Sequence, residues 1–201
     1  MGEKGKKVGT PAGACLFPPF PPFLASMASS NRQRWATPWP VVQWANRRWG
    51  PFDIDLAAEE STAKCNQFIS PGEDALNPNT PWGRPRRKAT RAWLNPPWNN
   101  IDPFMERVIE EVYTERSLDL ICVLVPTRTG RPWWSECVER YGQVKLITGD
   151  EGRSSRISFI PPPGVNDAGG GFEDAAYVVF ERPLRLYQDI MVPYGGGTPC
   201  P

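Results

Sequence analysis

The sequence predicts an α/β fold with a mostly parallel sheet, helices on both of its faces and an antiparallel strand near the C-terminus. From Trp35 onward, short apolar runs alternate with helical segments, which favours parallel strands joined by helices. The run LDLICVLVP at 118–126 is almost continuously apolar, which is typical of a strand covered on both faces. Near the C-terminal end, RISFI at 156–160 and AAYVVF at 175–180 flank a Pro/Gly-rich loop and predict a closing strand pair.

The composition is that of a folded protein with many loops. A chain of 201 residues is long enough for one domain with a sizeable core, and 40% of it is hydrophobic. The 24 prolines and 18 glycines predict few, punctuated helices. The formal net charge of +1 is too balanced for a protein that coats nucleic acid by bulk electrostatics, so a nucleic-acid contact would need a local patch.

The sequence contains no histidine, which excludes Ser-His-Asp and Cys-His catalysis and imidazole metal ligands. The five cysteines are scattered and form no CxxC pair, so neither a disulfide framework nor a zinc site is predicted. Cys122 lies in an apolar run and is interpreted as a small core hydrophobe. We therefore expect no metal, and chemistry carried by carboxylates, backbone groups or a cofactor.

Three segments divide the chain. Residues 1–34 imitate the charge and apolar layout of a secretion signal, but the prolines of CLFPPFPPFLA favour polyproline or disorder. We predict a disordered, Pro-rich segment at 1–34, with Met1 and Met27 both open as the working start, a folded domain at 35–190 and a flexible tail at 191–201. No run approaches the roughly 20 apolar residues that span a bilayer, so no membrane association is expected.

The elements of the folded domain follow in order. Residues 41–49 carry apolar side chains at the spacing of one helical face. PFDIDLAA at 51–58 predicts a buried strand that ends in an acidic turn, and residues 59–66 a short helix. A short strand at 66–70 and a strand at 92–98 that runs into prolines come next.

Residues 99–117 form the clearest predicted helix. Asp102 is expected to cap it, Pro103 suits its first turn, and apolar residues recur at steps of three and four from Phe104 to Tyr113. Further along, Trp133 and Trp134 are interpreted as aromatic core residues of a helix, because adjacent helical residues cannot both face one groove.

The candidate catalytic residues are Asn95, Pro96, Pro97 and Trp98, at the carboxyl end of a predicted parallel strand, where open α/β sheets keep their ligand sites. An exocyclic amine on a conjugated ring is a poor nucleophile, because its lone pair is delocalised. Two acceptors, the Asn95 side-chain oxygen and the Pro96 carbonyl, would hold its hydrogens and favour tetrahedral nitrogen. Trp98 would supply the stacking that an extruded base loses. The alternative is a Pro-rich turn with a packed tryptophan.

Other segments accompany this motif in order: Trp35-Ala36-Thr37-Pro38, FDIDLAA at 52–58, Asp74-Ala75-Leu76, Pro126-Thr127-Arg128-Thr129 through Trp133-Trp134, and Arg156-Ile157-Ser158-Phe159. Together they resemble the phage-type DNA N6-adenine methyltransferases, Dam-like enzymes carried by many bacteriophages. The resemblance runs from Trp35 to about Arg182. It implies a Rossmann-like methyltransferase sheet, S-adenosylmethionine as the methyl donor and adenine in double-stranded DNA as the acceptor. It also implies a phage or prophage origin and the cytoplasm of a bacterial host.

The resemblance also implies a set of cofactor-binding residues. Thr37 and Pro38 would lie beside the methionine end, a carboxylate in the turn after the first strand would meet the ammonium group, and the 74–76 segment would hold the adenosine. The implied residues are Trp35, Thr37, Pro38, Asp55, Ala57, Asp74 and Leu76. Asp55 as a helix cap is the alternative. We expect Asn95, Asp55 and Asp74 to line one pocket. The first turn lacks Gly-x-Gly, and a Trp follows Pro-Pro where Tyr or Phe is more usual.

Residues 84–91 carry five positive charges and no acid, and they enter the strand that ends at Asn95. This run and two arginines after the 118–126 strand are expected to contact DNA phosphates, with a plain solvated surface as the alternative. The predicted DNA-binding residues are Arg84, Arg86, Arg87, Lys88, Arg91, Arg128 and Arg131. Loops at 77–91 and 161–174 are long enough to carry sequence preference.

Two other functions stay open: methyl transfer to another planar amine or amide, such as protein glutamine or RNA guanine, and a non-catalytic DNA-binding relative. The former enzymes usually carry a glycine-rich first turn and an extra substrate domain, and neither is seen in the sequence. The recognised bases, the number of strands methylated, an acidic residue for the ribose and the oligomeric state are also left open.

Overall fold

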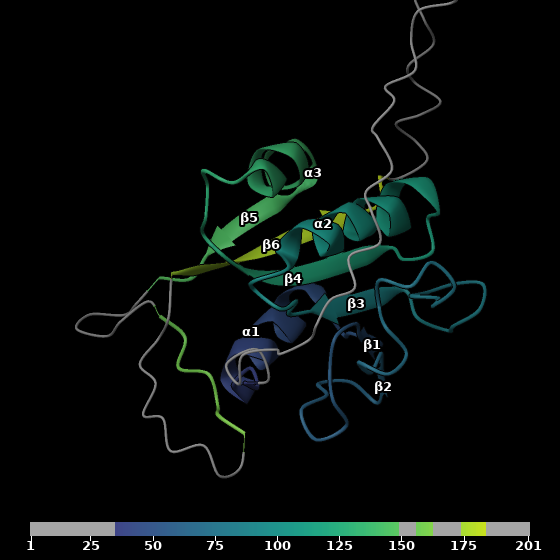
Figure 1. Ribbon diagram of the computed structural model, residues 1–201, viewed down its shortest axis with the longest axis horizontal. Helices are drawn as coiled ribbons and strands as arrows, with labels where there is room; N and C mark the ends of the chain where they lie inside the picture. The colour runs from purple at the N-terminus through teal and green to yellow at the C-terminus, as the bar shows by residue number, and fades with distance from the viewer. Residues whose placement is uncertain (1–34, 149–155, 163–173, 184–201) are drawn as a thin grey trace, which may run out of the picture.

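The computed structural model describes residues 35–148, 156–162 and 174–183, and within these ranges a six-stranded mixed sheet forms the centre of the fold (Figure 1). The strands are β1 (Ile54–Asp55), β2 (Gln67–Phe68), β3 (Arg91–Leu94), β4 (Leu120–Pro126), β5 (Gln143–Leu146) and β6 (Ala175–Glu181). Their order is β2-β1-β3-β4-β6-β5. Neighbours among β1 to β4 pair in parallel, whereas β6 is antiparallel to both β4 and β5. The α/β class and the antiparallel C-terminal strand are therefore confirmed.

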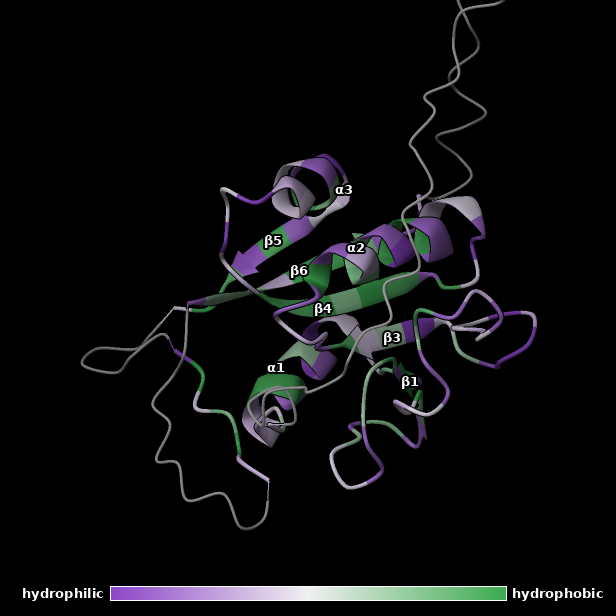
Figure 2. Ribbon diagram, viewed as in Figure 1, coloured by the Kyte–Doolittle hydropathy of each residue, from purple (hydrophilic) through white to green (hydrophobic). Residues whose placement is uncertain are grey.

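The strand β4 divides the core into two halves. Its even-numbered residues from Leu120 to Leu124 belong to a cluster with helix α1 (Trp39–Trp49), and its odd-numbered residues from Ile121 to Val125 belong to a cluster with helix α2 (Ile101–Ile109). Because successive side chains of a strand point to opposite faces, the two helices cover opposite sides of the sheet. Figure 2 shows β4 as a continuously hydrophobic strand, as the sequence predicts. Cys122 is fully buried in it, which raises the pKa of its thiol.

Helix α1 (Trp39–Trp49) confirms the helix predicted at 41–49. Pro38 precedes the helix. Pro40 lies in its first turn, where the missing N–H of a proline costs no hydrogen bond. Val42 and Ala45 are buried against the sheet. Trp44 instead keeps 36% of its surface exposed while its ring stacks on Tyr177, with centroids 5.0 Å apart.

Helix α2 (Ile101–Ile109) continues as the π-helical turn η2 (Glu110–Thr114) and confirms most of the helix predicted at 99–117. The apolar face is buried at Phe104, Met105 and Val108. The predicted cap is wrong, because the helix begins at Ile101 after Asn100, which places Asp102 inside the first turn. A carboxylate there still interacts favourably with the partial positive charge of the helix N-terminus.

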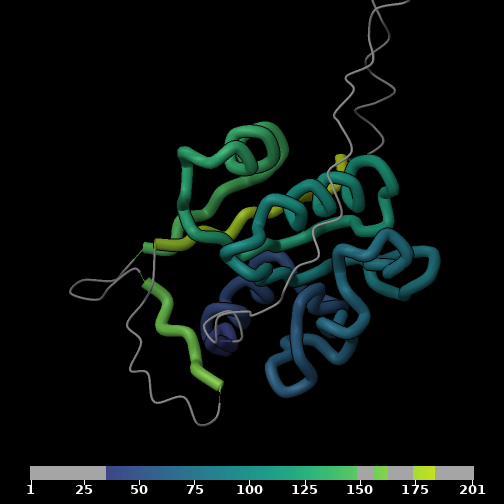
Figure 3. Tube along the Cα trace, in the orientation of Figure 1, coloured from purple at the N-terminus to yellow at the C-terminus, as the bar shows by residue number. Residues whose placement is uncertain are grey.

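Two predicted elements are wrong. Residues 59–66 form turns and no helix (Figure 3), since the N–H of Lys64 donates to the Asp55 side chain instead of continuing a helical ladder. The segment 156–160 is extended but is not a strand of the sheet. It forms one bridge to Ala36 and buries Ile157 and Phe159 on the α1 side. The partner of β6 at the sheet edge is β5, which the sequence did not predict.

The connection between β4 and β5 contains the π-helical turn η3 (Trp134–Val138) and the short helix α3 (Glu139–Tyr141). Trp133 and Trp134 are each about 5% exposed and pack in the α2-side cluster, so their interpretation as core aromatics is confirmed.

The predictions for 1–34, for 191–201 and for most of the 161–174 loop fall outside the described residues. Within the described ranges, no helix combines the length and apolarity needed to cross a membrane. The same ranges hold no group of three or more Cys, Asp or Glu side chains arranged to hold a metal ion.

Candidate active site

A pocket opens where β1 and β3 end side by side. The two strands are parallel, with Asp55 opposite Trp93, and the N–H of Leu56 donates to the Trp93 carbonyl at 2.9 Å. The pocket holds about 260 Å³ of empty space, including space continuous with solvent. It is lined by Trp35, Ala36, Thr37, Asp55, Ala57, Ala58, Thr62, Lys64, Trp93 and Asn95. The structure thus brings Asn95 together with four of the seven predicted cofactor residues, namely Trp35, Thr37, Asp55 and Ala57.

The Asn95 side chain is held at both ends. Its Nδ2 donates to the Thr37 hydroxyl oxygen at 3.0 Å, and its Oδ1 accepts from the indole N–H of Trp98 at 3.1 Å. An amide oxygen carries two lone pairs, so Oδ1 retains capacity for one further donor. Asn95 is half-buried at the pocket wall, where it presents an oriented hydrogen-bond acceptor.

The rest of the Asn-Pro-Pro-Trp segment forms a braced turn between β3 and α2. The N–H of Asn100 donates to the Pro97 carbonyl at 2.9 Å, which closes the turn. The Trp98 ring meets the buried Phe159 ring edge-on, with centroids 5.2 Å apart. From the end of β4, the Arg128 guanidinium donates to the Trp98 carbonyl at 3.0 Å. The turn is therefore fixed from three directions.

Asp55 is the acidic group of the pocket and is 2% exposed. Its carboxylate accepts from the backbone N–H groups of Lys64 at 3.0 Å and Ala57 at 3.3 Å. Burial raises the pKa of Asp55 to about 6, although these two hydrogen bonds and the nearby Lys64 charge oppose the rise. Among the residues that the structure describes, none forms an ion pair with this buried carboxylate, which is therefore poised to gain from a cationic ligand group.

The comparisons with known proteins give this pocket its context. The family model described as DNA N-6-adenine-methyltransferase (Dam) matches residues 25–194. The chain belongs to the Dam family of DNA N-6-adenine-methyltransferases. It is 29% identical over 138 residues to the DNA N-6-adenine-methyltransferase of Escherichia phage T1, a match that covers 64% of this chain and 54% of that protein. The Haemophilus phage HP1 protein of the same name is 30% identical over 132 residues, with 65% and 68% covered.

The chain therefore matches about half the length of the T1 member of the Dam family and about two thirds of the HP1 member. The family model extends ten residues ahead of the predicted domain start at 35 and four residues past its predicted end at 190.

The Asp74–Leu76 segment of this Dam family member does not line the pocket. Asp74 is exposed, adopts a positive φ of 54° and accepts from the N–H of Leu76 at 3.0 Å. The expectation that Asp74 shares a pocket with Asn95 is thus not met in this structure. Pro38 likewise lies outside the pocket lining, directly before α1.

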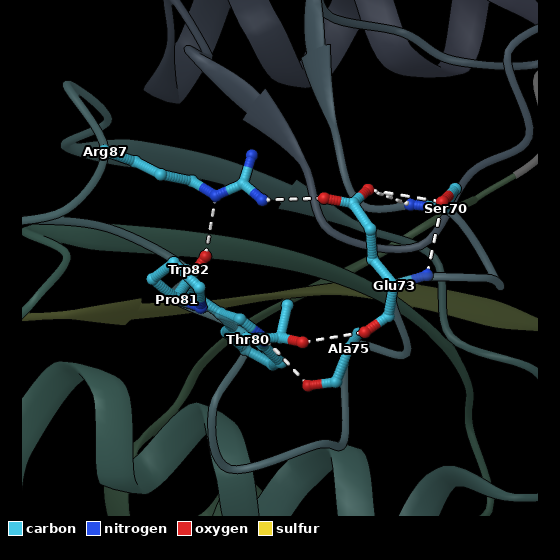
Figure 4. A network of polar contacts seen from close by, with 7 residues as sticks. All are labelled: Ser70, Glu73, Ala75, Thr80, Pro81, Trp82 and Arg87. Atoms are coloured by element: carbon cyan, nitrogen blue, oxygen red, sulfur yellow. Dashed lines mark hydrogen bonds and ion pairs between the residues drawn. The ribbon is translucent and has the colours of Figure 1, made fainter.

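A polar network braces the loop that carries Asp74 (Figure 4). Glu73 accepts from both the N–H and the hydroxyl of Ser70, and its other oxygen pairs with Arg87 at 3.0 Å. The Thr80 hydroxyl donates to the Glu73 carbonyl at 2.7 Å, and the indole N–H of the fully buried Trp82 donates to the Ala75 carbonyl at 2.9 Å. The 70–82 loop is accordingly tied down at several points.

The basic run at 84–91 lies at the amino end of β3, away from Asn95. Arg91 is the first residue of β3 and donates to the Trp49 and Gly50 carbonyls. Arg84 pairs with Asp119 at 2.7 Å, just ahead of β4, and Arg87 donates to the Pro81 carbonyl as well as to Glu73. Within the run, Arg86 and Lys88 are exposed. Asn95 follows Arg91 by four residues, at about 3.3 Å each, which puts roughly 13 Å between the two residues.

Arg128 and Arg131 lie at the same edge as Asn95, beyond the carboxyl end of β4. Arg128 contacts the Trp98 backbone as described above, and Arg131 is exposed in the turn that leads into η3. These two arginines are the predicted DNA-binding residues that the structure brings to the pocket side.

The sequence pattern missed several pocket residues: Ala36, Ala58, Thr62, Lys64 and Trp93. Lys64 reaches the pocket because the turns at 59–66 fold back on Asp55, and its Nζ lies 4.7 Å from the centre of the Trp39 ring. Ala36 and Ala58 lie inside the quoted segments at 35–38 and 52–58 without a role assigned to them, and no motif marks Thr62, Lys64 or Trp93. Trp93 is the one with a readable signal, because it lies two residues before Asn95 and therefore on the same face of the strand.

Proposed function

We propose that this protein is a methyltransferase that transfers a methyl group from S-adenosylmethionine to the N6 amine of adenine in double-stranded DNA. The observation that carries the proposal is the shared pocket of Asn95 and Asp55 at the carboxyl edge of adjacent parallel strands. Membership of the Dam family supports DNA adenine as the acceptor. The strand order with a reversed β6 supports a Rossmann-like methyltransferase sheet. Because the relatives described above are phage proteins, we infer that the protein works in the cytoplasm of a bacterial host.

The chemistry of the pocket fits the proposed cofactor. S-adenosylmethionine supplies an activated methyl group on a sulfonium sulfur when it is bound. Asp55 offers a buried carboxylate for its ammonium group, and the aromatic side chain of Trp35 in the same lining suits a cation. We propose that Thr37 and Ala57 complete the wall at the methionine end, as the family resemblance implies. Pro38, Asp74 and Leu76 are proposed as cofactor contacts on the resemblance alone.

The protein contributes position and charge complementarity, without a nucleophile of its own. Asn95 Oδ1 and the Pro96 carbonyl accept the two hydrogens of the adenine amine and stabilise the positive charge that grows on the nitrogen. Pro97 restricts the backbone that aims the carbonyl, and the Trp98 ring stacks on the extruded base. With S-adenosylmethionine bound, the new N–CH₃ bond would form as the S–CH₃ bond breaks, and the excess proton of the amine would pass to water. Holding reacting atoms about 3–3.5 Å apart supplies much of the rate.

We propose that Arg128 and Arg131 are the main phosphate contacts, because they lie on the pocket side of the sheet. Arg86 and Lys88 are exposed and extend the proposed contact surface. Arg84, Arg87 and Arg91 bind acids or carbonyls of the protein, as Arg128 binds the Trp98 carbonyl, but they do so at the opposite edge of the sheet. Of these two groups of cations, the pocket-side arginines are the ones nearest the position of an extruded base.

Replacing Arg131 by glutamine is expected to weaken duplex DNA binding and to reduce the slope of log K against log salt by about one, since each phosphate contact contributes about 0.9 to that slope. The matched variant Arg84→Gln removes an equal charge from the opposite edge and should leave the slope unchanged. Fluorescence anisotropy with a labelled duplex, over roughly 50 to 200 mM salt, gives the affinity and the salt slope of each variant. Equal slopes for Arg131→Gln and the wild type would remove Arg131 from the interface.

Expression in a bacterial strain that lacks adenine methylation tests the function directly. Genomic DNA from the expressing cells should contain N6-methyladenine, detectable by mass spectrometry of digested nucleosides, and sequencing would give the recognised bases. Methylation of protein glutamine or RNA guanine with unmodified DNA adenine would favour the other planar acceptors. DNA binding without measurable S-adenosylmethionine binding would instead indicate a non-catalytic relative.

A further inference from the structure

An asparagine at the head of this motif raises an orientation problem. A carboxylate presents two equivalent oxygens, whereas an amide presents an acceptor at one end and a donor at the other. Only Oδ1 of Asn95 can accept a hydrogen from an amine. If the amide turned by 180°, its NH₂ would face the amine and repel it.

The neighbours of Asn95 determine which end faces which way. The Thr37 hydroxyl can donate or accept, so its 3.0 Å contact with Asn95 is compatible with either orientation of the amide. The indole N–H of Trp98 can only donate, and it lies 3.1 Å from Asn95 Oδ1. A turned amide would put NH₂ against N–H and lose this bond. Trp98 therefore distinguishes the two orientations.

The Trp98 indole is itself fixed. Phe159 lies edge-on against its ring at 5.2 Å, and Arg128 holds its backbone carbonyl from the end of β4. The ring also packs against both core clusters. The fold therefore fixes the direction in which the indole N–H points, and this direction is fixed before any base enters the pocket.

We propose that Trp98 is a positioning residue in addition to a stacking surface: its indole N–H locks the Asn95 amide with Oδ1 available to the target amine. The inference rests on the proposed function. Phenylalanine at position 98 would keep a flat apolar face but supplies no donor, and the tyrosine hydroxyl would stand at a different place from the indole nitrogen. In the motif Asn-Pro-Pro-Trp, the last residue then orients the side chain of the first.

The test compares the effect of Trp98→Phe in two proteins: one with the amide of Asn95, which has one acceptor oxygen, and one with a carboxylate at position 95, which has two equivalent oxygens. In the Asn95 protein, Trp98→Phe should lower kcat for DNA adenine methylation tenfold or more. In an Asn95→Asp protein the same substitution should lower kcat less than threefold, because either carboxylate oxygen accepts. Loss of stacking alone would cost the same factor in both backgrounds. The affinity for S-adenosylmethionine, measured by calorimetry, should change less than threefold on Trp98→Phe.

A second substitution keeps the test decisive when Asn95→Asp is inactive. Replacing Trp98 with 3-benzothienylalanine preserves the bicyclic aromatic shape and puts a sulfur atom in place of the N–H donor. This variant should also lower kcat at least tenfold, with the fold intact by circular dichroism. Wild-type-like kcat in this variant, or equal losses in the two backgrounds, would overturn the positioning role while leaving the proposed function standing. A wild-type protein that methylates no adenine would overturn the proposed function itself, and this inference with it.

Discussion

Replacing Asn95 with alanine should lower the single-turnover rate of methyl transfer at least about 100-fold, the range seen when one preorganised polar group is removed from an active site. The variant loses the acceptor that holds the target amine, and the Trp98 N–H and Thr37 hydroxyl lose their partner. The affinity for S-adenosylmethionine should change less than threefold, because Asp55 and the aromatic lining remain. Transfer of a labelled methyl group to duplex DNA and calorimetry give the two values.

Asn99→Ala is the matched control for this experiment. Asn99 lies four residues further along the same turn and is exposed. Removing the Asn99 side chain should leave the transfer rate within about twofold of the wild type, since substitutions of exposed residues outside the site and the core have small effects. Near-normal turnover in the Asn95→Ala variant would contradict the proposed acceptor role.

Replacing Asp55 with asparagine should weaken S-adenosylmethionine binding and abolish its pH dependence below neutrality. Burial raises the pKa of Asp55 to about 6, so the cofactor-free protein carries a protonated Asp55 below that pH. The ammonium group of the ligand, with a pKa of about 7.7–8.0 for an α-amino group, stays charged there. Because the ionised carboxylate attracts it, affinity should fall as pH drops below about 6, by up to about tenfold per unit.

The stability of the cofactor-free protein provides an independent check on the direction of the Asp55 pKa shift. Between the ordinary carboxyl pKa of 3.8 and about 6, the folded state binds more protons at Asp55 than the unfolded state. Its contribution to the free energy of unfolding therefore falls as pH rises through this window. Asp55→Asn should lack this decline, whereas Glu60→Gln, an exposed acid in the following turns, should keep it. Urea denaturation at pH 4.5 and 6.5 measures the difference. An identical pH dependence in Asp55→Asn and wild type would contradict the assignment.

Local pattern was sufficient to predict the centre of the site. Asn95 follows a short buried strand and precedes a well-marked helix, so its place at a strand's carboxyl end needed no tertiary information. Asp55 ends a second buried strand, and parallel pairing brings the two ends together. Lys64 and Thr62 reach the pocket through turns with no regular period, and their contribution depends on the folded path of 59–66.

The wrong predictions have separate physical causes. The alternation in 156–160 is real, because Ile157 and Phe159 are buried and their neighbours exposed, but the segment buries them against the α1-side cluster instead of joining the sheet. The edge strand β5 is exposed along its whole length and alternates between hydrophilic and hydrophobic residues (Figure 2), so it lacks the apolar signal of a core strand. The basic run at 84–91 precedes β3 and lies at the sheet edge opposite Asn95, because a strand carries its two ends to opposite edges, and its contact with DNA stays a prediction.

The pocket draws on residues that precede α1, on the end of β1 and the turns after it, and on the end of β3, so parts of the chain that are separated in sequence meet there. No single helix, strand or turn contains the whole set of pocket residues. A nick in a surface loop would preserve it as long as the two pieces stay associated, whereas release of β1 from β3 would dismantle the methionine end and the amine-binding end simultaneously. Recovery of catalysis during refolding is thereby coupled to completion of the central strand pairing.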